Sequence, residues 1–593
     1  MKHLLHLNKY IWHYRWHLLG GIVFLVISNY LKTVQPKVVR WAIDYTSDLV
    51  NDSSVEGGIS LFGTHGSQLL RYGLMIVGLS LMGGFVLFLT RQTLIVMSRL
   101  IERDLRNELY QQYNRLDQKF YKTHNTGDLM SRITEDVTKV RMYLGPGIMY
   151  TINLVSVFVL VIYSMLRVSP TLTLYALMPL PILSVSIYYV SNIINKKSHA
   201  IQKQLSFLTT ISQEVFSGIR VIKSYTQERA MFGFFKEECE NYKDVNLNLA
   251  RVQALFFPLM ILLVGASTII CIYAGGKLVI AGEISQGNIA EFVIYVNMLS
   301  WPVTAVGWIA SMVQQAAASQ ERINQFLSEE PEIETKESGI SRKIEGDIVF
   351  DEVSFTYPET GIRALDKLNL HIKPGERVLI LGRTGSGKST ILDLLSGVYP
   401  VKEGKILIDG IPLDHYNLGE LRRQIAYVPQ DVFLFSDSIE RNVAFGLKEM
   451  PDREEIEKFT EYSSIKNEIK DLKKGFETLV GERGVTLSGG QKQRISIARS
   501  LITKPQMIAL DDSLSAIDAN AESRILNYLD KELDGKTSII VAHRVYPNLK
   551  FDQIFVLDKG RVVEHGTHKE LSENGGYYEE IFKKQLEEEP ADG

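Results

Sequence analysis

A short glycine-rich stretch between two apolar runs has residue types suited to binding phosphate. Residues 378–381 are apolar, residues 391–395 are mostly apolar, and between them lies Gly382-Arg383-Thr384-Gly385-Ser386-Gly387-Lys388-Ser389-Thr390. This order predicts a strand, a loop and a helix. The spacing G-x-x-x-x-G-K-[ST] is that of a P-loop, whose glycines let backbone N–H groups turn toward phosphate oxygens at the positive end of the following helix.

The P-loop pattern assigns a role to two side chains. Lys388 would reach the β- and γ-phosphates of a nucleotide, and the Ser389 hydroxyl would be a Mg²⁺ ligand. A glycine-rich turn with a chance lysine is the alternative, but it does not explain the apolar strand before the loop and the apolar helix after it. We therefore interpret this stretch as a nucleotide-binding site.

Two other segments add to the predicted site. Residues 507–510 form a second apolar run that ends at Asp511, where a carboxylate can hold Mg²⁺. Before this run stands Leu487-Ser488-Gly489-Gly490-Gln491, which is followed by a helical run to Ile502. Because Ser488 and the glycines open a helix, we interpret this segment as a second anion site with no phosphate of its own.

The P-loop, the sequence LSGGQ and the run that ends at Asp511, in this order, resemble the ABC transporter family. The resemblance implies that Tyr357 stacks on adenine and that Gln430 is the Q-loop glutamine, which senses Mg²⁺ and the attacking water. It implies that His543 is the switch histidine, which contacts the γ-phosphate. Residues 515–518 then resemble the D-loop.

The same resemblance implies a dimer. Two ATP molecules would lie head to tail between two subunits, and the LSGGQ segment would contact the ATP on the opposing P-loop. The residues of this contact would be Ser488, Gly489, Gly490 and Gln491. Residues 481–484, ahead of this segment, resemble the X-loop of exporters.

The residue after Asp511 departs from the family pattern. Family members commonly have Glu there, as the general base that orients water for attack on the γ-phosphorus, whereas this chain has Asp512. Aspartate is shorter by one methylene, about 1.5 Å, and a positioned general base contributes about 10² to 10⁴ in rate. We therefore expect slow hydrolysis at this chain's own P-loop. The alternative is that Asp512 serves as the base through an adjusted backbone.

The elements that must position these residues differ between the two parts of the chain. The 593 residues are 45% apolar and 22% charged on average, but the average combines an apolar part and a polar part. The formal net charge of −3 argues against a nucleic-acid partner. The two cysteines, Cys239 and Cys271, suggest neither a disulfide framework nor a metal cluster.

Six apolar stretches precede the nucleotide-binding region, each long enough to cross the bilayer core as a helix of about twenty residues. They are residues 18–34, 72–90, 148–165, 172–190, 255–274 and 289–310. Six crossings put both ends of this part on one side of the membrane. Residues 45–68 contain no Lys or Arg, whereas residues 91–141 contain ten. The positive-inside rule therefore places the second segment and both termini in the cytoplasm.

Two connections between the spans are too long for turns. Residues 91–147 and 191–253 keep a helical periodicity, so we expect the spans to continue into the cytoplasm and return. At the far ends, near Thr126 and Ser217, a glycine interrupts each pattern, and a short crosswise helix is predicted there. The resemblance implies that these are coupling helices, whereas spacing alone also allows simple hairpin turns.

The sequence thus predicts an all-α membrane domain of six helices, followed by an α/β P-loop ABC ATPase domain with a largely parallel sheet. The transmembrane domain comprises residues 1–325 and the polar linker residues 326–343. The nucleotide-binding domain comprises residues 344–584, and residues 585–593 form an acidic tail.

Six spans followed by one ATP-binding domain resemble a half-transporter of the exporter type. The resemblance implies that a dimer in the plasma membrane uses ATP to move an amphipathic or lipophilic compound out of the cytoplasm or between leaflets. Asp512 favours a heterodimer with a half-transporter that has Glu at this position, and a homodimer is the alternative. A membrane-bound regulator or nucleotide-gated pore could use the same ATPase without pumping. The spans exclude a soluble ABC ATPase.

The identity of the substrate does not follow from the sequence. Several polar and aromatic residues inside the spans could line a cavity or could equally form contacts between helices. They are Asn29, Tyr30, Asn153, Tyr295, Asn297, Trp301 and Trp308. We recognise no cluster of fixed charges in the spans, and this argues against a small ionic substrate.

Overall fold

The computed structural model describes residues 2–51, 64–333, 338–481, 484, 486–532, 535–546 and 549–588. Within it the chain divides into two compact units. The first, which we call the helical unit, comprises Met1–Asn114 and Gly127–Glu329. The second, which we call the α/β unit, comprises Arg115–Thr126 and Glu330–Gly593.

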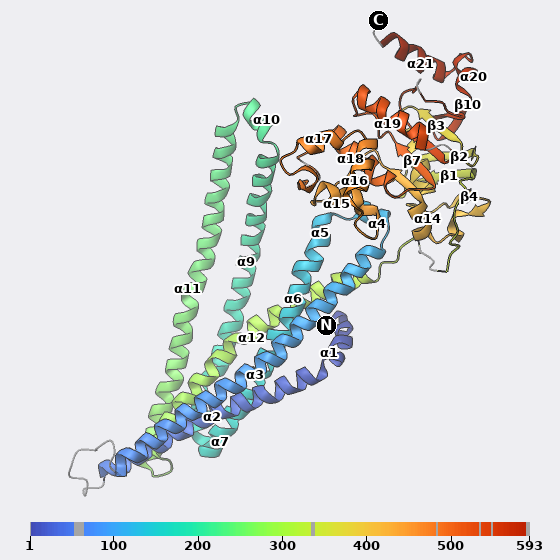
Figure 1. Ribbon diagram of the computed structural model, residues 1–593. Helices are drawn as coiled ribbons and strands as arrows, with labels where there is room; N and C mark the ends of the chain where they lie inside the picture. Colours follow the sequence, from blue (N-terminus) through green and yellow to red (C-terminus); the bar gives the residue numbers. More distant parts are fainter. Residues whose placement is uncertain are drawn as a thin grey trace. The chain divides into compact units, whose positions relative to one another are not determined.

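The helical unit consists of long helices (Figure 1). Helix α12 packs against α2, α7 and α11, so it lies at the centre of the unit. The elements in chain order are η1 (Lys2–Leu7), α1 (Asn8–His13), α2 (Arg15–Asn51), α3 (Thr64–Arg115), α5 (Thr126–Ser131), η2 (Arg132–Asp136), α6 (Val137–Met142), η3 (Tyr143–Gly147), α7 (Ile148–Val168), α8 (Pro170–Leu177), α9 (Pro179–Ser217), α10 (Ile219–Ser224), α11 (Glu228–Ile280) and α12 (Gln286–Leu327).

Five helical segments of the described residues are long and apolar enough to cross a membrane: Arg15–Val50, His65–Arg115, Thr126–Val168, Glu228–Ile280 and Gln286–Leu327. Five of the six predicted spans lie within them. The predicted fourth span, residues 172–190, instead extends over α8 and α9, and neither helix belongs to this group of five. Pro179, which lacks a backbone N–H, begins α9 directly after the break at Met178.

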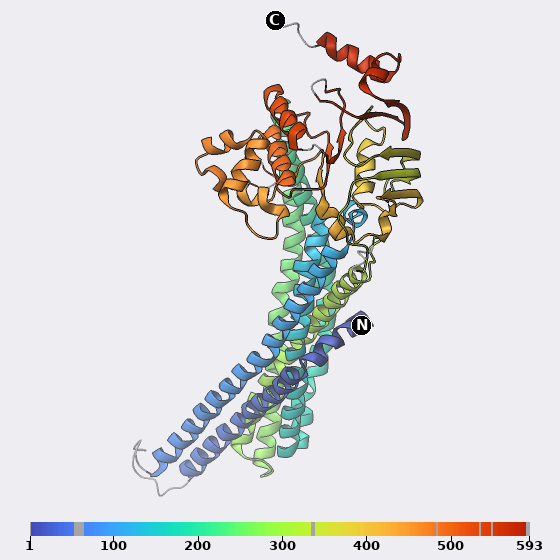
Figure 2. The same ribbon diagram turned by 45° about the vertical axis from the view of Figure 1, so that its right-hand side comes forward.

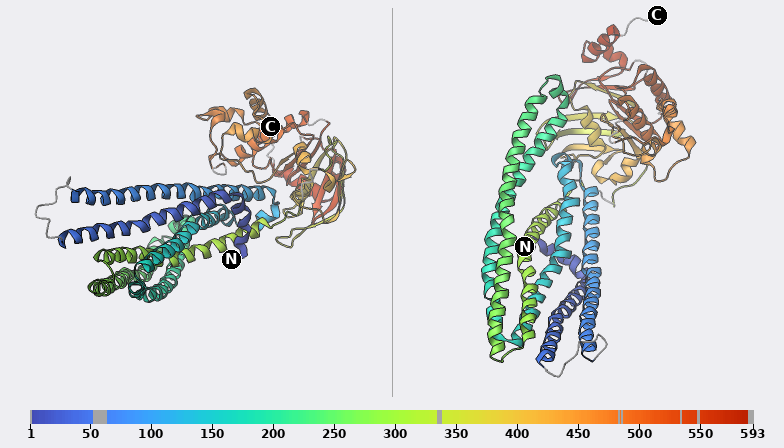
Figure 3. Two further views of the ribbon diagram at one scale, coloured as in Figure 1. Left: turned by 90° about the horizontal axis from the view of Figure 1, so that it is seen from below. Right: turned by 90° about the vertical axis from the view of Figure 1, so that its left-hand side faces the viewer.

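The long connections between the spans are helical, as predicted. Helix α3 has 52 residues and is therefore about 78 Å long at 1.5 Å per residue. Helices α9 and α11 run side by side as a long hairpin, with the short helix α10 at its tip (Figure 3). The short helices predicted near Thr126 and Ser217 are α4 (Gln118–Thr123) with α5, and α10. By its contacts, α4 belongs to the α/β unit.

The α/β unit contains two sheets. The six-stranded sheet has the order β10-β9-β3-β8-β7-β6, and all its neighbouring pairs are parallel except β9 with β10. A separate antiparallel sheet has the order β2-β1-β4-β5, and its strands lie side by side in Figure 2. The largely parallel sheet was predicted, whereas the antiparallel one was not.

The strands are β1 (Ile348–Thr356), β2 (Arg363–Ile372), β3 (Arg377–Gly382), β4 (Glu403–Ile408), β5 (Ile411–Pro412), β6 (Ile425–Val428), β7 (Met507–Asp511), β8 (Thr537–Val541), β9 (Gln553–Asp558) and β10 (Arg561–Gly566). The helices are α4, α13 (Lys388–Leu395), η4 (Leu413–His415), α14 (Leu418–Gln424), α15 (Ile439–Val443), η5 (Ala444–Gly446), α16 (Arg453–Tyr462), α17 (Lys466–Asp471), η6 (Gly475–Glu477), α18 (Gly489–Leu501), α19 (Ala519–Glu532), α20 (His568–Ser572) and α21 (Tyr577–Glu588).

Strand β3 is buried on both faces. Leu379 and Leu381 belong to one apolar cluster of the unit, and Val378 and Ile380 belong to the other. Successive side chains of a strand point to opposite faces, so a continuous apolar run indicates a strand covered on both sides. This burial holds the end of β3, from which the glycine-rich loop begins.

Two predicted boundaries meet the ends of helices. Helix α12 ends at Leu327, just inside the predicted linker, and residues 334–337 of that linker lie outside the described residues. Helix α21 continues to Glu588, so the first four residues of the predicted acidic tail are helical. Residues 589–593 lie outside the described part of the chain.

Candidate functional site

The structure contains the predicted strand, loop and helix around the glycine-rich sequence. Strand β3 ends at Gly382 and helix α13 begins at Lys388. Gly385 and Gly387 have φ angles of +80° and +101°, in the left-handed region that favours glycine. A Cβ atom at Gly387 would also collide with a neighbouring backbone oxygen. The loop therefore has a backbone that requires glycine.

The buried polar atoms of the loop fit a phosphate ligand. Lys388 Nζ donates hydrogen bonds to the backbone oxygens of Gly382 (2.8 Å) and Arg383 (2.9 Å). The Ser386 hydroxyl is buried and has no hydrogen-bond partner among the described residues. Burial lowers the pKa of Lys388, and two nearby aspartates oppose this shift. An ammonium group and an unpartnered hydroxyl in a glycine loop match what nucleotide phosphates require.

Ser389 and Asp511 bring two oxygen ligands together. Strand β7 ends at Asp511, and Ser389 Oγ donates a hydrogen bond of 3.0 Å to Asp511 Oδ1. Burial raises the pKa of Asp511 to about 6, while the bond from Ser389 opposes the shift. Mg²⁺ prefers hard oxygen ligands, usually one or two from the protein with the rest from phosphate and water. The pair therefore fits a Mg²⁺ ion.

Asp512 lies beside Gln430. Gln430 Nε2 donates to Asp512 Oδ2 at 3.5 Å, and the Asp512 N–H donates to the Val541 oxygen at 2.9 Å. Asp512 has a φ angle of +44°, in the left-handed region that aspartate tolerates better than most residues with a side chain. His543 follows β8, the neighbour of β7, and its side chain is exposed. Among the described residues, no hydrogen bond joins His543 to Gln430, Asp512 or Val541.

Tyr357 lies beside the helix that follows the loop. Its hydroxyl forms a hydrogen bond of 2.9 Å with Thr390 Oγ1, and Thr390 itself is buried. Lys122 Nζ of α4 lies 5.2 Å from the centre of the Tyr357 ring and 5.1 Å from that of Tyr399. These contacts were not predicted. The sequence signal for them was a lysine in the segment expected to form a crosswise helix. The exposed loop residues include Arg383 and Thr384.

The LSGGQ segment forms the start of helix α18, as predicted. Ser488 is its N-cap, and Ser488 and Gln491 exchange two hydrogen bonds, from Ser488 N to Gln491 Oε1 (2.9 Å) and from Gln491 N to Ser488 Oγ (3.3 Å). A Cβ atom at Gly489 would meet nothing within 4 Å, whereas one at Gly490 would lie 2.7 Å from the Ala516 oxygen. The segment is thus open at Gly489 and closely packed at Gly490.

The predicted D-loop lies within the described residues, whereas the predicted X-loop lies only partly within them. Within residues 515–518, Ser515 Oγ donates a hydrogen bond of 2.9 Å to the Asp512 oxygen, so this segment contacts the site. In the predicted X-loop, residues 482 and 483 lie outside the described residues.

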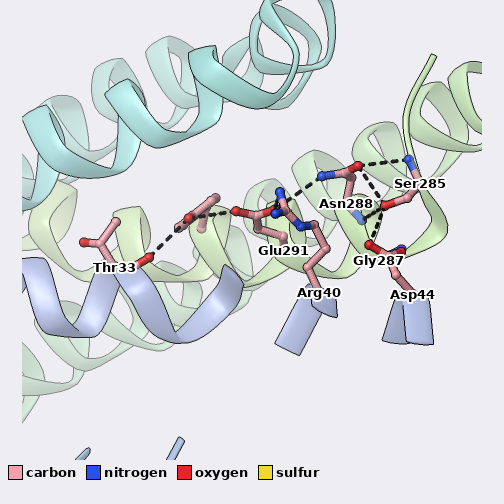
Figure 4. Close-up of polar contacts among 8 residues, drawn as sticks. Thr33, Arg40, Asp44, Ser285, Gly287, Asn288 and Glu291 are labelled. Atoms are coloured by element: carbon pink, nitrogen blue, oxygen red, sulfur yellow. Dashed lines mark hydrogen bonds and ion pairs between the residues drawn. The ribbon is translucent and has the colours of Figure 1, made fainter. Parts of the chain in front are cut away.

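The helical unit contains a charged cluster that the sequence analysis missed. Glu291 of α12 is buried and accepts hydrogen bonds from Arg40 Nη1 of α2 (3.1 Å), Asn288 Nδ2 (3.3 Å) and the Tyr295 hydroxyl (3.0 Å) (Figure 4). The Tyr295 hydroxyl also lies 3.2 Å from the Thr33 oxygen. Of the cluster's charged residues only Glu291 lies inside a predicted span, and this ion pair was not anticipated from the sequence.

The cluster continues toward the end of α2. Asp44 accepts hydrogen bonds from Ser285 Oγ (2.9 Å) and the Gly287 N–H (2.8 Å) at the start of α12 (Figure 4). A glutamate and a lysine stand inside the predicted spans, at positions 291 and 32, and ionisable residues in such segments are themselves a signal of function. That signal was available from the sequence.

The polar residues considered for a cavity divide into two groups. Asn29 is buried, and its Nδ2 donates a hydrogen bond of 2.6 Å to Ser156 Oγ of α7; Tyr295 is buried against Glu291. These two residues form contacts between or within helices. Side chains that remain exposed in the chain as described are Tyr30, Asn297, Trp301 and Trp308, while Asn153 is half-buried.

Comparisons with known proteins agree with this arrangement. The family model "ABC transporter transmembrane region" matches residues 18–303, and the model "ABC transporter" matches residues 365–515. A probable multidrug resistance ABC transporter ATP-binding/permease protein, YheI of Bacillus subtilis, is 37% identical over 82% of this chain and 83% of its own length. An ATP-dependent lipid A-core flippase of Pseudomonas fluorescens is 34% identical over 85% of this chain and 84% of its own.

A solved structure shows the same fold. It is described as a bacterial Atm1-family ABC exporter with ATP bound, and it matches with a TM-score of 0.74 at 23% identity over 96% of this chain and 98% of that one. The matches therefore extend over both units and not over the nucleotide-binding part alone. This chain belongs to the ABC transporter family, and it joins a transmembrane region and an ATPase domain of that family in one polypeptide.

Proposed function

We propose that this chain is one half of a dimeric exporter that uses ATP to move an amphipathic or lipophilic compound out of the cytoplasm or between leaflets. As a member of the family, it is an integral membrane protein whose ATPase is coupled to transport. The observation that carries the proposal is that similarity to a probable multidrug resistance ABC transporter and to a lipid A-core flippase extends over more than four fifths of the chain. The charge pattern favours a plasma-membrane protein with both termini in the cytoplasm.

The geometry supports a division of roles in the nucleotide site. In our proposal, the N–H groups of residues 382–390 and Lys388 bind the phosphates of ATP, and Tyr357 stacks on the adenine. Ser389 and Asp511 would hold Mg²⁺, with Gln430 close by. When bound, this ion neutralises charge on the phosphate oxygens.

Hydrolysis requires a base and a water-positioning group. Asp512 is the candidate base because its carboxylate lies next to Gln430, and His543 at the end of the adjacent strand would contact the γ-phosphate. Ser488, Gly489, Gly490 and Gln491 would contact the ATP of the opposing subunit. The open space at Gly489 supports that role, because it leaves the start of α18 accessible to another chain.

The hairpin formed by α9 and α11 supports the presence of a second subunit. At its tip, Phe216, Val221 and Tyr225 are 75%, 60% and 72% exposed, and α10 has no buried residue. Large apolar side chains grouped at one exposed point mark an interaction site. We propose that this tip docks on the nucleotide-binding domain of the partner subunit.

We further propose that the partner is a different half-transporter. Asp512 is shorter than the usual glutamate by about 1.5 Å, so a homodimer would contain two weak sites, whereas a partner with Glu would contribute one strong site. The alternative is a homodimer in which Asp512 is a competent base. That alternative would rely on the contact with Gln430, which holds the short carboxylate in place.

The experiment compares this chain purified alone with the co-expressed pair in proteoliposomes, each with and without Asp512→Glu. ATP hydrolysis and movement of a labelled lipophilic compound against its gradient are both measured. The control is Lys388→Ala, which is expected not to bind ATP at this chain's own site. We expect the pair to exceed the lone chain. Full activity of the lone chain with no gain from Asp512→Glu would refute the heterodimer. ATP hydrolysis without movement of any tested compound would instead indicate a regulator or pore.

A further inference from the structure

We propose that a groove between α2, α3 and α12 binds the anionic head group of an amphiphile through Lys32. This inference rests on the proposed function, since it names the chemical class of the substrate. The groove has a volume of about 480 Å³, within the range of small-molecule sites. Its wall includes Lys32, Gln35, Ser80, Gly84, Ile294 and Met298.

Lys32 is a cation without a partner in a membrane-spanning helix. It lies within the first predicted span and makes no hydrogen bond or ion pair with any described residue. A lysine at such a position is unfavourable unless an anion or water compensates it, so intramembrane ionisable residues mark functional sites. No acidic side chain is part of the groove wall. An anion that pairs with Lys32 in this groove would therefore come from a bound molecule and not from the wall.

The charged cluster of Figure 4 shows that two other charged residues of α2 already have partners. Arg40, eight residues and about 12 Å further along α2, is paired with the buried Glu291. Asp44, one turn beyond Arg40, accepts two hydrogen bonds from the start of α12. Glu291 and its neighbours are thus already engaged, and Lys32 remains available to a ligand.

The rest of the groove wall suits an amphiphile. Gln35 Nε2 donates a hydrogen bond of 3.1 Å to Ser80 Oγ, so these two polar side chains of the wall are joined to each other. Ile294 and Met298 supply an apolar surface. One cation beside an apolar wall matches an anionic head group attached to a hydrocarbon chain.

Glycine keeps the groove open. A Cβ atom added at Gly84 of α3 would meet no atom within 4 Å, so this position faces empty space. A leucine at this position of the groove wall would add side-chain volume without a backbone clash. Gly84→Leu therefore tests the volume of the site, whereas Lys32→Gln tests its charge.

The experiment measures binding to the full-length protein in phosphatidylcholine nanodiscs without ATP. The probe is the fluorescent fatty acid 11-(dansylamino)undecanoic acid, and its uncharged methyl ester is the matched comparison. We expect Lys32→Gln to weaken binding of the acid about tenfold, which corresponds to about 1.4 kcal/mol, and to leave binding of the ester unchanged. Lys32→Arg should retain tight binding of the acid.

Two variants serve as further tests. Lys37→Gln removes a lysine that is also half-buried on α2 but is not part of the groove wall, and it should change nothing. Gly84→Leu should weaken binding of both probes. Basal ATP hydrolysis, to which none of these residues is assigned, shows that each variant is folded.

Competition identifies the source of the anion. Dodecyl phosphate should displace the probe, whereas inorganic phosphate and acetate at the same concentration should not. Equal displacement by the free anions would refute the claim that the ligand is an amphiphile. Equal affinity of Lys32→Gln and wild type for the acid would refute the site itself. Binding of the acid, together with no ATP-driven movement of any tested compound in proteoliposomes, would leave the site valid and would refute the proposed export function.

Discussion

The buried ion pair between α2 and α12 allows a quantitative prediction. Glu291 has no exposed side-chain area, whereas Arg40 keeps 24% of its side chain exposed. Arg40→Met leaves a buried carboxylate without its cation, and removal of one partner of a buried pair costs about 3–5 kcal/mol. Glu291→Met leaves Arg40 within reach of water, so we expect a smaller loss of about 1–3 kcal/mol.

The double variant should be more stable than either single one. Replacement of both charges by methionine leaves no unpaired ion, and such replacements change stability little or raise it. Tyr295 keeps the Thr33 oxygen as an acceptor in every variant. We therefore expect a loss below about 1 kcal/mol for Arg40→Met with Glu291→Met. The effects of the two substitutions are thus strongly non-additive.

The assay is thermal unfolding of the full-length protein in one detergent, followed with a maleimide dye. Cys271 is buried in α11 and reacts only when the helical unit opens, and Cys239→Ser removes the more accessible thiol. At roughly 2 °C per kcal/mol for a large domain, Arg40→Met should lower the melting temperature by about 6 °C or more. Additive shifts, with the double variant least stable, would refute the reasoning.

Three further predictions concern the α/β unit. Lys388→Ala should abolish ATP binding at this chain's own site, measured with a fluorescent nucleotide, while membrane insertion stays intact; unchanged affinity would contradict the P-loop assignment. Gly490→Ala should lower the melting temperature, because its Cβ would lie 2.7 Å from a backbone oxygen and overpacking costs about 1–3 kcal/mol. Gly489→Ala should leave the melting temperature unchanged, because its Cβ would meet no atom within 4 Å. Gln585→Leu removes both hydrogen bonds between α21 and Val545, a loss of about 1–3 kcal/mol that should appear as a lower melting temperature and slower ATP hydrolysis.

Contiguous motifs allowed the sequence to predict much of the nucleotide site. The glycine loop, the strand before it and the helix after it were all found where they were predicted, because covalent spacing alone places Lys388 and Ser389 relative to the loop backbone. The start of α18 directly after its N-cap Ser488 follows from local capping chemistry in the same way. The assigned roles of these residues remain predictions.

The sequence was less informative where helices are interrupted or strands pair over long distances. The predicted fourth span is divided between α8 and α9, since a hydropathy pattern does not reveal where proline ends a helix. The antiparallel sheet joins β1 with β4, about 55 residues apart, and no local pattern specifies such a partner.

By itself the sequence determined the family, the order of its two parts and the residues of the P-loop, because these depend on local spacing and on runs of apolar side chains. The tertiary structure decided which charges in the membrane part are paired. Arg40 and Glu291 are 251 positions apart and meet only because α2 packs on α12. Lys32 is on the same helix and finds no such partner among the described residues. The physical reason is that the environment of a charge depends on the neighbours that packing brings to it, and chain order does not specify these.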